Sequence, residues 1–237
     1  MEESAELRLA IENLYATFAS YPLREDTNAC PCCHNPEGEK RVHRASLRKL
    51  NPSDLEEYAT DALFVWGDET DFKHFLPRIF ELAAAHGDEF VDPEVVLNKL
   101  HHADWQHWPD VEQSAVEQFL HALWRCILDG RPHEYYGWQI EGWLCGIGKA
   151  VDDLSPYLKT WAEMETENAR LNLAGFIADT DFANPNCHAT AYWEERAELF
   201  AEVGTWVRGQ IMKEKMKAIA AEFPQYDFVE RAYISLP

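Results

Sequence analysis

The chain has 237 residues, enough for one large or two small domains with a substantial apolar core. A hydrophobic content of 46% and nine tryptophans exclude an intrinsically disordered protein, because disorder requires low hydrophobicity. The 42 acidic residues outnumber the 21 basic ones and give a formal net charge of -21, which disfavours binding to nucleic acid or to anionic membranes.

The N-terminal residues do not look like a targeting segment. Residues 1–19 carry four glutamates where a secretory leader would have a basic start, and no stretch approaches the ~18 apolar residues of a membrane span. The six cysteines are not spaced as a disulfide framework. We therefore expect a cytoplasmic protein with reduced thiols and no membrane partner.

Residues 20–52 differ from the rest of the chain because they contain four prolines and little apolar periodicity. This composition predicts a loop-rich insert after a first helix. The expected organisation is an N-terminal helix with a cysteine-rich loop over residues 1–52, followed by a helical body over residues 53–237.

A compact group of thiols and imidazoles lies in this insert, in the order Cys30, Pro31, Cys32, Cys33 and His34, with His43 nine positions further on. The two-residue gap between Cys30 and Cys33 lets both thiolates reach one ion from a tight turn. Structural zinc takes four such ligands in a tetrahedron, so we predict a structural zinc ion held by Cys30, Cys32, Cys33 and His43. His34 is an alternative ligand, and the distant pair Cys187 and His188 is another.

Helical periodicity begins after the insert. Apolar residues at steps of three and four predict a helix from Ser53 that Gly67 stops, with Ser53 and Glu56 as its capping box. A second apolar stripe runs from Phe72 to Ala83 and contains Pro77, so this helix should be kinked or should begin later than the pattern indicates.

Further helices are predicted over residues 93–102, 111–128 and about 133–149, with two more near 156–180 and a long one over about 189–221. No convincing alternation of apolar and polar residues indicates a strand. The expected fold is therefore all-α, either a multi-helix bundle or a HEAT-like stack of helix pairs, with an N-terminal zinc-stapled loop.

Asp68, Asp71 and His74 cluster where the second of these helices begins. Asp71 and His74 are three residues apart and could act as a general-base pair or as metal ligands. Acidic residues are also expected at helix starts, where they cap the backbone, and we favour this interpretation.

The Cys-Pro-Cys-Cys motif, His43, the sequence Trp66-Gly67-Asp68 and the run from Asp71 to Arg78 together resemble a family of uncharacterised bacterial proteins. The resemblance covers roughly residues 14–128. It implies a bacterial origin and that Cys30, Cys32, Cys33 and His43 belong together, and it implies no activity.

Charge is unevenly placed along the chain. Residues 53–71 hold seven acids and no lysine or arginine, whereas residues 40–49 hold five bases and no acid. We predict a non-enzymatic module that engages a basic protein partner through Asp54, Glu56, Glu57, Asp61, Asp68 and Asp71. An immunity or inhibitor-type protein is the most specific form of this prediction. The alternative is a metal-dependent enzyme that uses the cysteine and histidine cluster or Asp68, Asp71 and His74.

Overall fold

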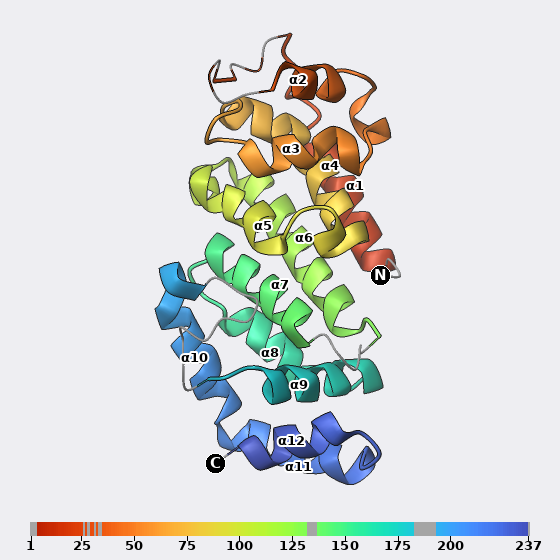
Figure 1. Cartoon of the computed structure of the whole chain (residues 1–237), viewed down its shortest axis with the longest axis vertical. Coiled ribbons are helices and arrows are strands. Elements are labelled where there is room, and N and C mark those ends of the chain that lie inside the picture. The colour runs from red at the N-terminus through yellow and green to blue at the C-terminus, as the bar shows by residue number, and fades with distance from the viewer. Residues whose placement is uncertain are drawn as a thin grey trace. The chain divides into compact units, whose positions relative to one another are not determined.

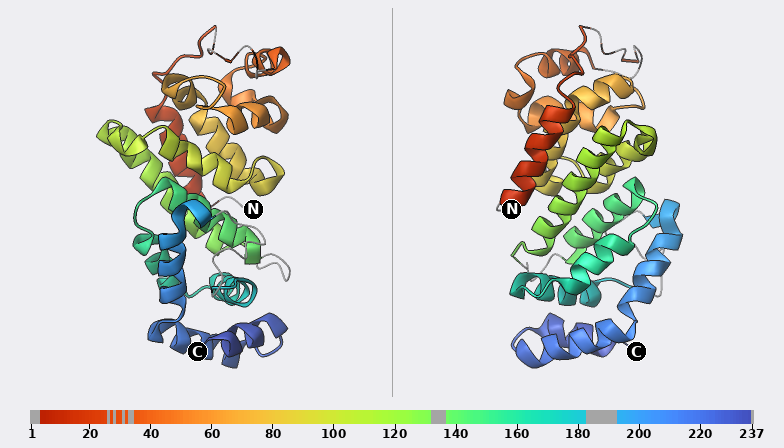
Figure 2. Two further views of the ribbon diagram at one scale, coloured as in Figure 1. Left: turned by 60° about the vertical axis from the view of Figure 1, so that its left-hand side comes forward. Right: turned by 180° about the vertical axis from the view of Figure 1, so that it is seen from behind.

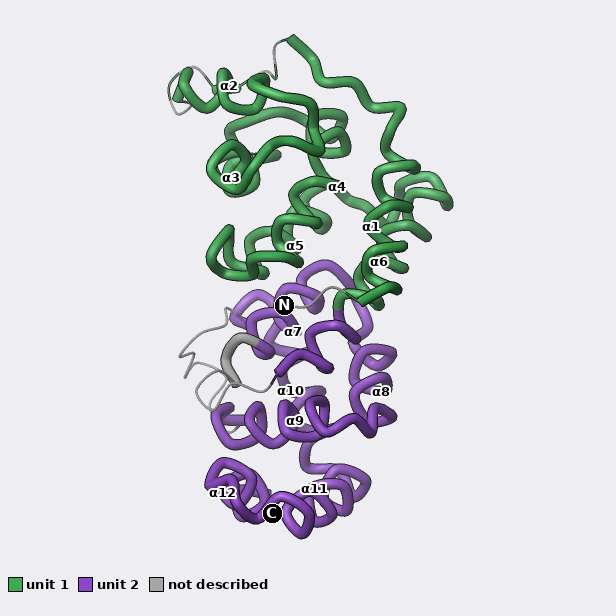
Figure 3. The backbone as a smooth tube through the Cα atoms, turned by 90° about the vertical axis from the view of Figure 1, so that its right-hand side faces the viewer, with its two compact units in different colours: residues 1–123 green, residues 124–237 purple. Residues whose placement is uncertain are grey.

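The computed structural model describes residues 4–25, 27, 29–30, 32, 35–131, 137–182 and 193–236. The chain divides into two compact units, residues 1–123 and 124–237 (Figure 3). Every named element within the described residues is helical, which confirms the all-α prediction (Figure 1). The β-type pairing among them is limited to an isolated bridge between Ala62 and Trp66. None of the described helices is long and apolar enough to cross a bilayer.

The helices of unit 1 are α1 (Ala5–Thr17), α2 (Pro36–Val42), α3 (Pro52–Asp61), α4 (Glu69–His86), α5 (Pro93–His102) and α6 (Asp110–Leu128), which continues into unit 2. Short 3-10 turns are η1 (Leu47–Lys49), η2 (Gly87–Glu89) and η3 (Trp105–His107). Helix α1 packs on α4, and α2 packs on α3. The predicted boundary after residue 52 falls inside unit 1, after the first residue of α3.

Helix α4 carries much of the core of unit 1. Phe72, Phe75 and Leu76 are fully buried, and Phe80 stacks on Phe119 of α6 with 4.9 Å between ring centroids. The helix begins at Glu69 and continues through Pro77, so the predicted alternative of a late start is wrong. Asp68 caps the helix, and a capping box with Asp71 fixes its first turn before Pro77 is reached.

Helix α3 differs from its prediction at both ends. Its capping box pairs Asn51 with Asp54, not Ser53 with Glu56, because Pro52 takes the first helical turn and moves the start upstream. The helix ends at Asp61 rather than near Gly67. A tight turn follows in which Leu63 adopts a left-handed φ of 69°, a conformation that side chains other than glycine rarely take.

The insert over residues 20–52 is less irregular than its composition indicates. It contains α2, whose start is fixed by Asn35 as N-cap and by Pro36 as the first helical residue. The sequence gives this helix only seven residues and no apolar stripe, which is why its periodicity is invisible.

Unit 2 contains α7 (Gly137–Ala150), α8 (Ser155–Glu163), α9 (Glu167–Asp179), the 3-10 turn η4 (Trp193–Arg196), α10 (Ala197–Val207), α11 (Gln210–Glu222) and α12 (Asp227–Ser235). Helices α11 and α12 run side by side, α12 packs on α9, and α9 packs on α7 (Figure 2). Trp161 lies at the centre of an aromatic cluster in this unit. Its ring centroid is 5.4 Å from that of Trp124 and 5.1 Å from that of Phe176.

The prediction of one long helix over residues 189–221 is wrong. Within its described part, residues 193–221, the segment forms η4, α10 and α11, and α10 is separated from α11 by Arg208 and Gly209. Gly209 takes an extended conformation with ψ at 155° and acts as the N-cap of α11. Glycine is a poor helix former, so the helix is interrupted at Gly209 although the apolar pattern continues on both sides of it.

Four helix C-termini are closed by side chains from distant helices. Lys99 Nζ donates to the carbonyls of Thr60 and Ala62 at the end of α3, and Lys215 Nζ donates to those of Ala162 and Met164 at the end of α8. In the same way Asn172 closes α6, and Arg196 donates to the Val151 carbonyl after α7. These donors satisfy carbonyls that a helix end leaves without a partner.

We expect Asn172→Ala to lower the free energy of unfolding by about 1–3 kcal/mol, because it leaves two acceptors without their donor. The Asn172 amide donates to Leu128 O and Gly130 O at 2.9 Å each, and the residue is 7% exposed. Asn168→Ala is the matched control, since Asn168 lies on the same helix and donates to Asp129 O in an exposed bond. Urea unfolding of both variants measures the difference, and equal losses would contradict the capping role.

Candidate functional site

The predicted zinc loop is attached to the turn between α3 and α4. The backbone N–H of Cys30 donates to the Val65 carbonyl at 2.8 Å, and the Sγ atoms of Cys30 and Cys32 lie 3.0 Å apart. The other predicted donors of the loop, Cys33 and His34, lie outside the described residues, as do Cys187 and His188. The structure therefore brings two of the predicted ligands together on a fixed support.

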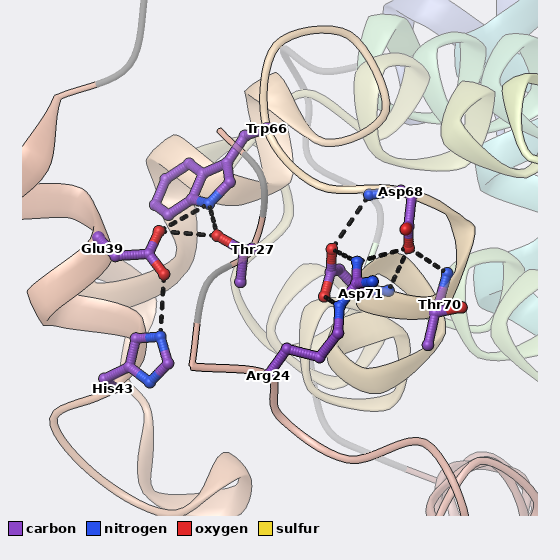
Figure 4. Close-up of polar contacts among 8 residues, drawn as sticks. All are labelled: Arg24, Thr27, Glu39, His43, Trp66, Asp68, Thr70 and Asp71. Atoms are coloured by element: carbon purple, nitrogen blue, oxygen red, sulfur yellow. Dashed lines mark hydrogen bonds and ion pairs between the residues drawn. The ribbon is translucent and has the colours of Figure 1, made fainter. Parts of the chain in front are cut away.

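His43, the fourth predicted ligand, is the C-cap of α2 and is held by Glu39 one helical turn earlier. His43 Nε2 lies 2.9 Å from Glu39 Oε1. The other carboxylate oxygen, Oε2, accepts from Thr27 Oγ1 at 2.7 Å and from the indole Nε1 of Trp66 at 3.1 Å (Figure 4). Trp66 Nε1 also donates to Thr27 Oγ1 at 2.5 Å. Glu39 thus links α2 to the turn that carries Trp66.

Among the described residues no group of three histidine, cysteine or acidic side chains is arranged to hold a metal ion. Cys30, Cys32 and His43 of the predicted set are all described and do not form such a group, and Cys33 lies outside the described residues. Two thiols and an imidazole with a carboxylate behind it are the donor types that zinc takes. The zinc site therefore stays a prediction.

Asp68 and Asp71 serve the start of α4, as the capping interpretation predicts. The Asp68 side chain accepts from the backbone of Thr70, and Asp71 Oδ2 accepts from Asp68 N at 3.1 Å. Arg24 crosses over both carboxylates, donating from Nε to Asp71 Oδ1 at 2.7 Å and pairing with Asp68 Oδ1 at 2.8 Å (Figure 4). Asp71 is 1% exposed, so this pair also anchors the segment around Arg24 to α4.

These contacts set the local electrostatics. Desolvation would raise the pKa of Asp68, but the Arg24 guanidinium and the backbone N–H groups of Asp71 and Thr70 lower it below its ordinary value. His74 faces another way, because its Nδ1 lies 2.7 Å from the carbonyl of Tyr21, and burial lowers its pKa. Asp71 is committed to Arg24 and the α4 start, so the geometry does not pair it with His74 as a general base.

The six acids predicted to meet a partner have different environments. Asp54 is 2% exposed and pairs with Arg44 at 2.7 Å, and Glu57 pairs with Arg41. Glu56 is exposed and Asp61 is half-buried. With Asp68 and Asp71 facing Arg24, four of these carboxylates engage arginines of the chain itself, and their role in partner binding stays a prediction.

A buried ion network was not anticipated from the sequence. Lys73, 4% exposed, pairs with Glu69 at 2.7 Å and with the buried Glu112 at 2.9 Å, and it lies 4.2 Å from the ring centroid of Trp108. Glu112 also accepts from the Tyr21 hydroxyl at 2.6 Å. The spacing of Glu69 and Lys73 is a visible helical signal, whereas Glu112 comes from α6 and no local pattern connects it to them.

We expect Arg24→Ala to lower the free energy of unfolding by about 1.5–3 kcal/mol, because it removes charge-assisted bonds to a carboxylate that is shielded from water. Lys40→Ala is the control, since Lys40 and its partner Glu37 are 71% and 65% exposed. Such an exposed pair adds little to stability, because water and salt screen its charges. Thermal or urea unfolding measures both, and a loss for Arg24→Ala no greater than for the control would refute the anchoring role.

Comparison of the chain with protein-family models, with curated proteins and with solved structures gave no match. The resemblance carried by the Cys-Pro-Cys-Cys motif therefore stays a prediction. Because a fold alone does not fix a function, the site described above has to carry the functional argument.

Proposed function

We propose that this chain is a non-enzymatic protein-binding module whose acidic helical surface engages a basic protein partner. The observation that carries the proposal is the pairing of charges in unit 1. Many of its lysines and arginines form ion pairs with carboxylates of the same chain, whereas several exposed carboxylates form no ion pair with a described residue. Long-range attraction from such a surface accelerates the encounter with a positively charged protein.

The internal pairs account for many of the basic residues of unit 1. Seven cations lie against carboxylates of the chain, namely Arg24, Lys40, Arg41, Arg44, Arg48, Lys73 and Arg78. Seven exposed acids form no ion pair with any other described residue, namely Glu25, Glu56, Asp88, Glu89, Asp92, Asp110 and Glu117. Charge left for an external partner is therefore mainly negative, in line with the net charge of -21.

The proposal includes a structural zinc ion held by Cys30, Cys32, Cys33 and His43. Three features support it: the Cys30 and Cys32 thiols lie together, the loop is attached to Val65, and Glu39 holds the His43 ring. The loop offers few apolar side chains, so metal binding would supply its folding energy.

The helical body acts in this proposal as a HEAT-like scaffold in the cytoplasm. Support comes from unit 2, where the pair α11 and α12 packs through α12 on α9, which in turn packs on α7. Stacked helix pairs present extended surfaces to other proteins. An inhibitor or immunity-type protein that masks a basic partner is the most specific form of the proposal.

The charge proposal predicts that capture of a partner is salt-dependent. With tagged protein as bait, we expect a basic protein retained at about 50 mM salt and released at about 300 mM, because screening shortens the range of the attraction. Neutralising the accessible acids of the predicted set, Glu56→Gln with Asp61→Asn, should lower recovery. Glu202→Gln with Glu230→Gln changes charge equally at exposed positions of unit 2 and is the control. Recovery of the partner that does not change with salt, or an equal loss of recovery in both variants, would count against the proposal.

The zinc proposal predicts one zinc ion per chain in protein purified without chelator. Cys30→Ser should lower the zinc content, because it removes a thiolate ligand. Elemental analysis of the wild type and the variant measures this. Cys126→Ser is the control, since Cys126 is a buried thiol of α6 outside the loop. Wild-type protein without zinc, or unchanged zinc in Cys30→Ser, would contradict the proposal.

A further inference from the structure

Two thiols in the segment before α2 lie close enough to form a bond with each other. The Sγ atoms of Cys30 and Cys32 are 3.0 Å apart, and neither residue is part of a disulfide. Residues two positions apart have Cα atoms no more than about 7 Å from each other, which is the upper end of the range that a disulfide spans. A movement of about 1 Å brings the two sulfurs to the bonded distance.

The two thiols differ in exposure and in support. Cys32 is exposed, whereas Cys30 is half-buried and its backbone N–H donates to the Val65 carbonyl at 2.8 Å. The residue after Val65 is Trp66, which is buried and donates from its indole to Thr27. Cys30 is therefore held against the body of unit 1, and Cys32 presents the sulfur that a dissolved reagent meets first.

The other described cysteines are not placed for the same chemistry. Cys126 and Cys145 lie in the apolar core of unit 2 and are 6% and 0% exposed. A thiol exchanges with a dissolved disulfide only where the reagent can reach its sulfur. Among the described cysteines, such a reagent therefore selects Cys30 and Cys32.

We propose that Cys30 and Cys32 form a modification site that a small-molecule disulfide of the glutathione type oxidises reversibly to an intramolecular disulfide. This inference needs neither the zinc ion nor the protein partner proposed above. Zinc and the disulfide exclude each other at these sulfurs, because a metal takes cysteine as the thiolate.

The reaction consists of two thiol–disulfide exchanges. Cys32, as its thiolate, attacks one sulfur of glutathione disulfide, whose S–S bond breaks and releases the first glutathione thiolate. The Cys30 thiolate then attacks the Cys32 sulfur of the mixed disulfide and expels the second glutathione thiolate. The two released thiolates take up the two protons that the cysteines lost. The cysteine pair is thus oxidised by two electrons, and glutathione disulfide is reduced to two molecules of glutathione.

The test uses the full chain, reduced, treated with chelator and equilibrated in buffers of glutathione and glutathione disulfide. Acid quenching, alkylation and mass spectrometry measure the fraction of protein that has lost two hydrogens. Cys33→Ser is the matched control, because it removes a thiol from the same segment and leaves the pair, so it should oxidise in the same buffer as wild type. Cys32→Ser should have its equilibrium constant for oxidation lowered at least about tenfold, or about 30 mV for a two-electron couple. Equal oxidation of Cys32→Ser and wild type, or loss of oxidation in Cys33→Ser, would overturn the inference.

A trapping experiment checks which thiol reacts first. When the second thiol is absent, the mixed disulfide with glutathione accumulates, and mass spectrometry detects it. Cys30→Ser combined with Cys33→Ser should gain glutathione on Cys32 faster than Cys32→Ser combined with Cys33→Ser gains it on Cys30, because Cys32 is the exposed thiol. The reverse order would overturn the two assigned roles. Purified wild type without zinc would contradict the zinc proposal and leave this inference standing, so the two failures are distinguishable.

Discussion

The structure depends on how helix ends are closed. The last carbonyls of a helix have no partner within it, and glycine in a left-handed conformation is the common local solution. Among the described helices, that type of residue follows α4, where Gly87 has a φ of 58°. Helices α3, α6, α7 and α8 instead receive donors from residues 37 to 53 positions away. The ends of these helices are therefore completed only when tertiary structure forms, which favours cooperative folding within each unit.

In unit 1 several ion pairs, like the helix caps, join residues that are distant in the sequence. The arginines after the cysteine cluster do not form a basic surface, because Arg41 and Arg44 turn back onto carboxylates of α3. Arg24 does the same at α4. The positive charges therefore hold the loop segments against α3 and α4, and the exposed carboxylates set the outward field. The same ion pairs therefore hold the loop in place and leave the surface charge negative.

Much of the fold could be predicted from apolar periodicity, and the misses have physical causes. Helix α5 over residues 93–102 was predicted with its bounds, and α6 to within one residue, because long apolar stripes dominate there. Helix α2 lacks such a stripe, and the break at Gly209 interrupts a stripe that continues across it. Both depend on local capping, which is weaker than periodicity as a sequence signal.

The candidate site was only partly visible in the sequence. The thiols and His43 could be found by residue type and spacing, and the cap at Asp68 by its position. Glu39 could have been noticed, since it stands four residues before His43. Thr27 and Trp66 lie 39 residues apart, and only the folded chain brings them to the same carboxylate. Lys73 and Glu112 meet for the same reason, through the packing of α4 and α6.

The lysine that closes α3 has a chemical consequence of its own. Burial lowers the pKa of Lys99 to about 8, so above that pH most of it is an uncharged, nucleophilic amine. The side chain is only 1% exposed, with Nζ between two carbonyls and 4.0 Å from the ring centroid of Phe64. An acylating reagent reaches this nitrogen only while α5 is parted from α3. The rate at which Lys99 is acylated would therefore report how often this part of the molecule opens.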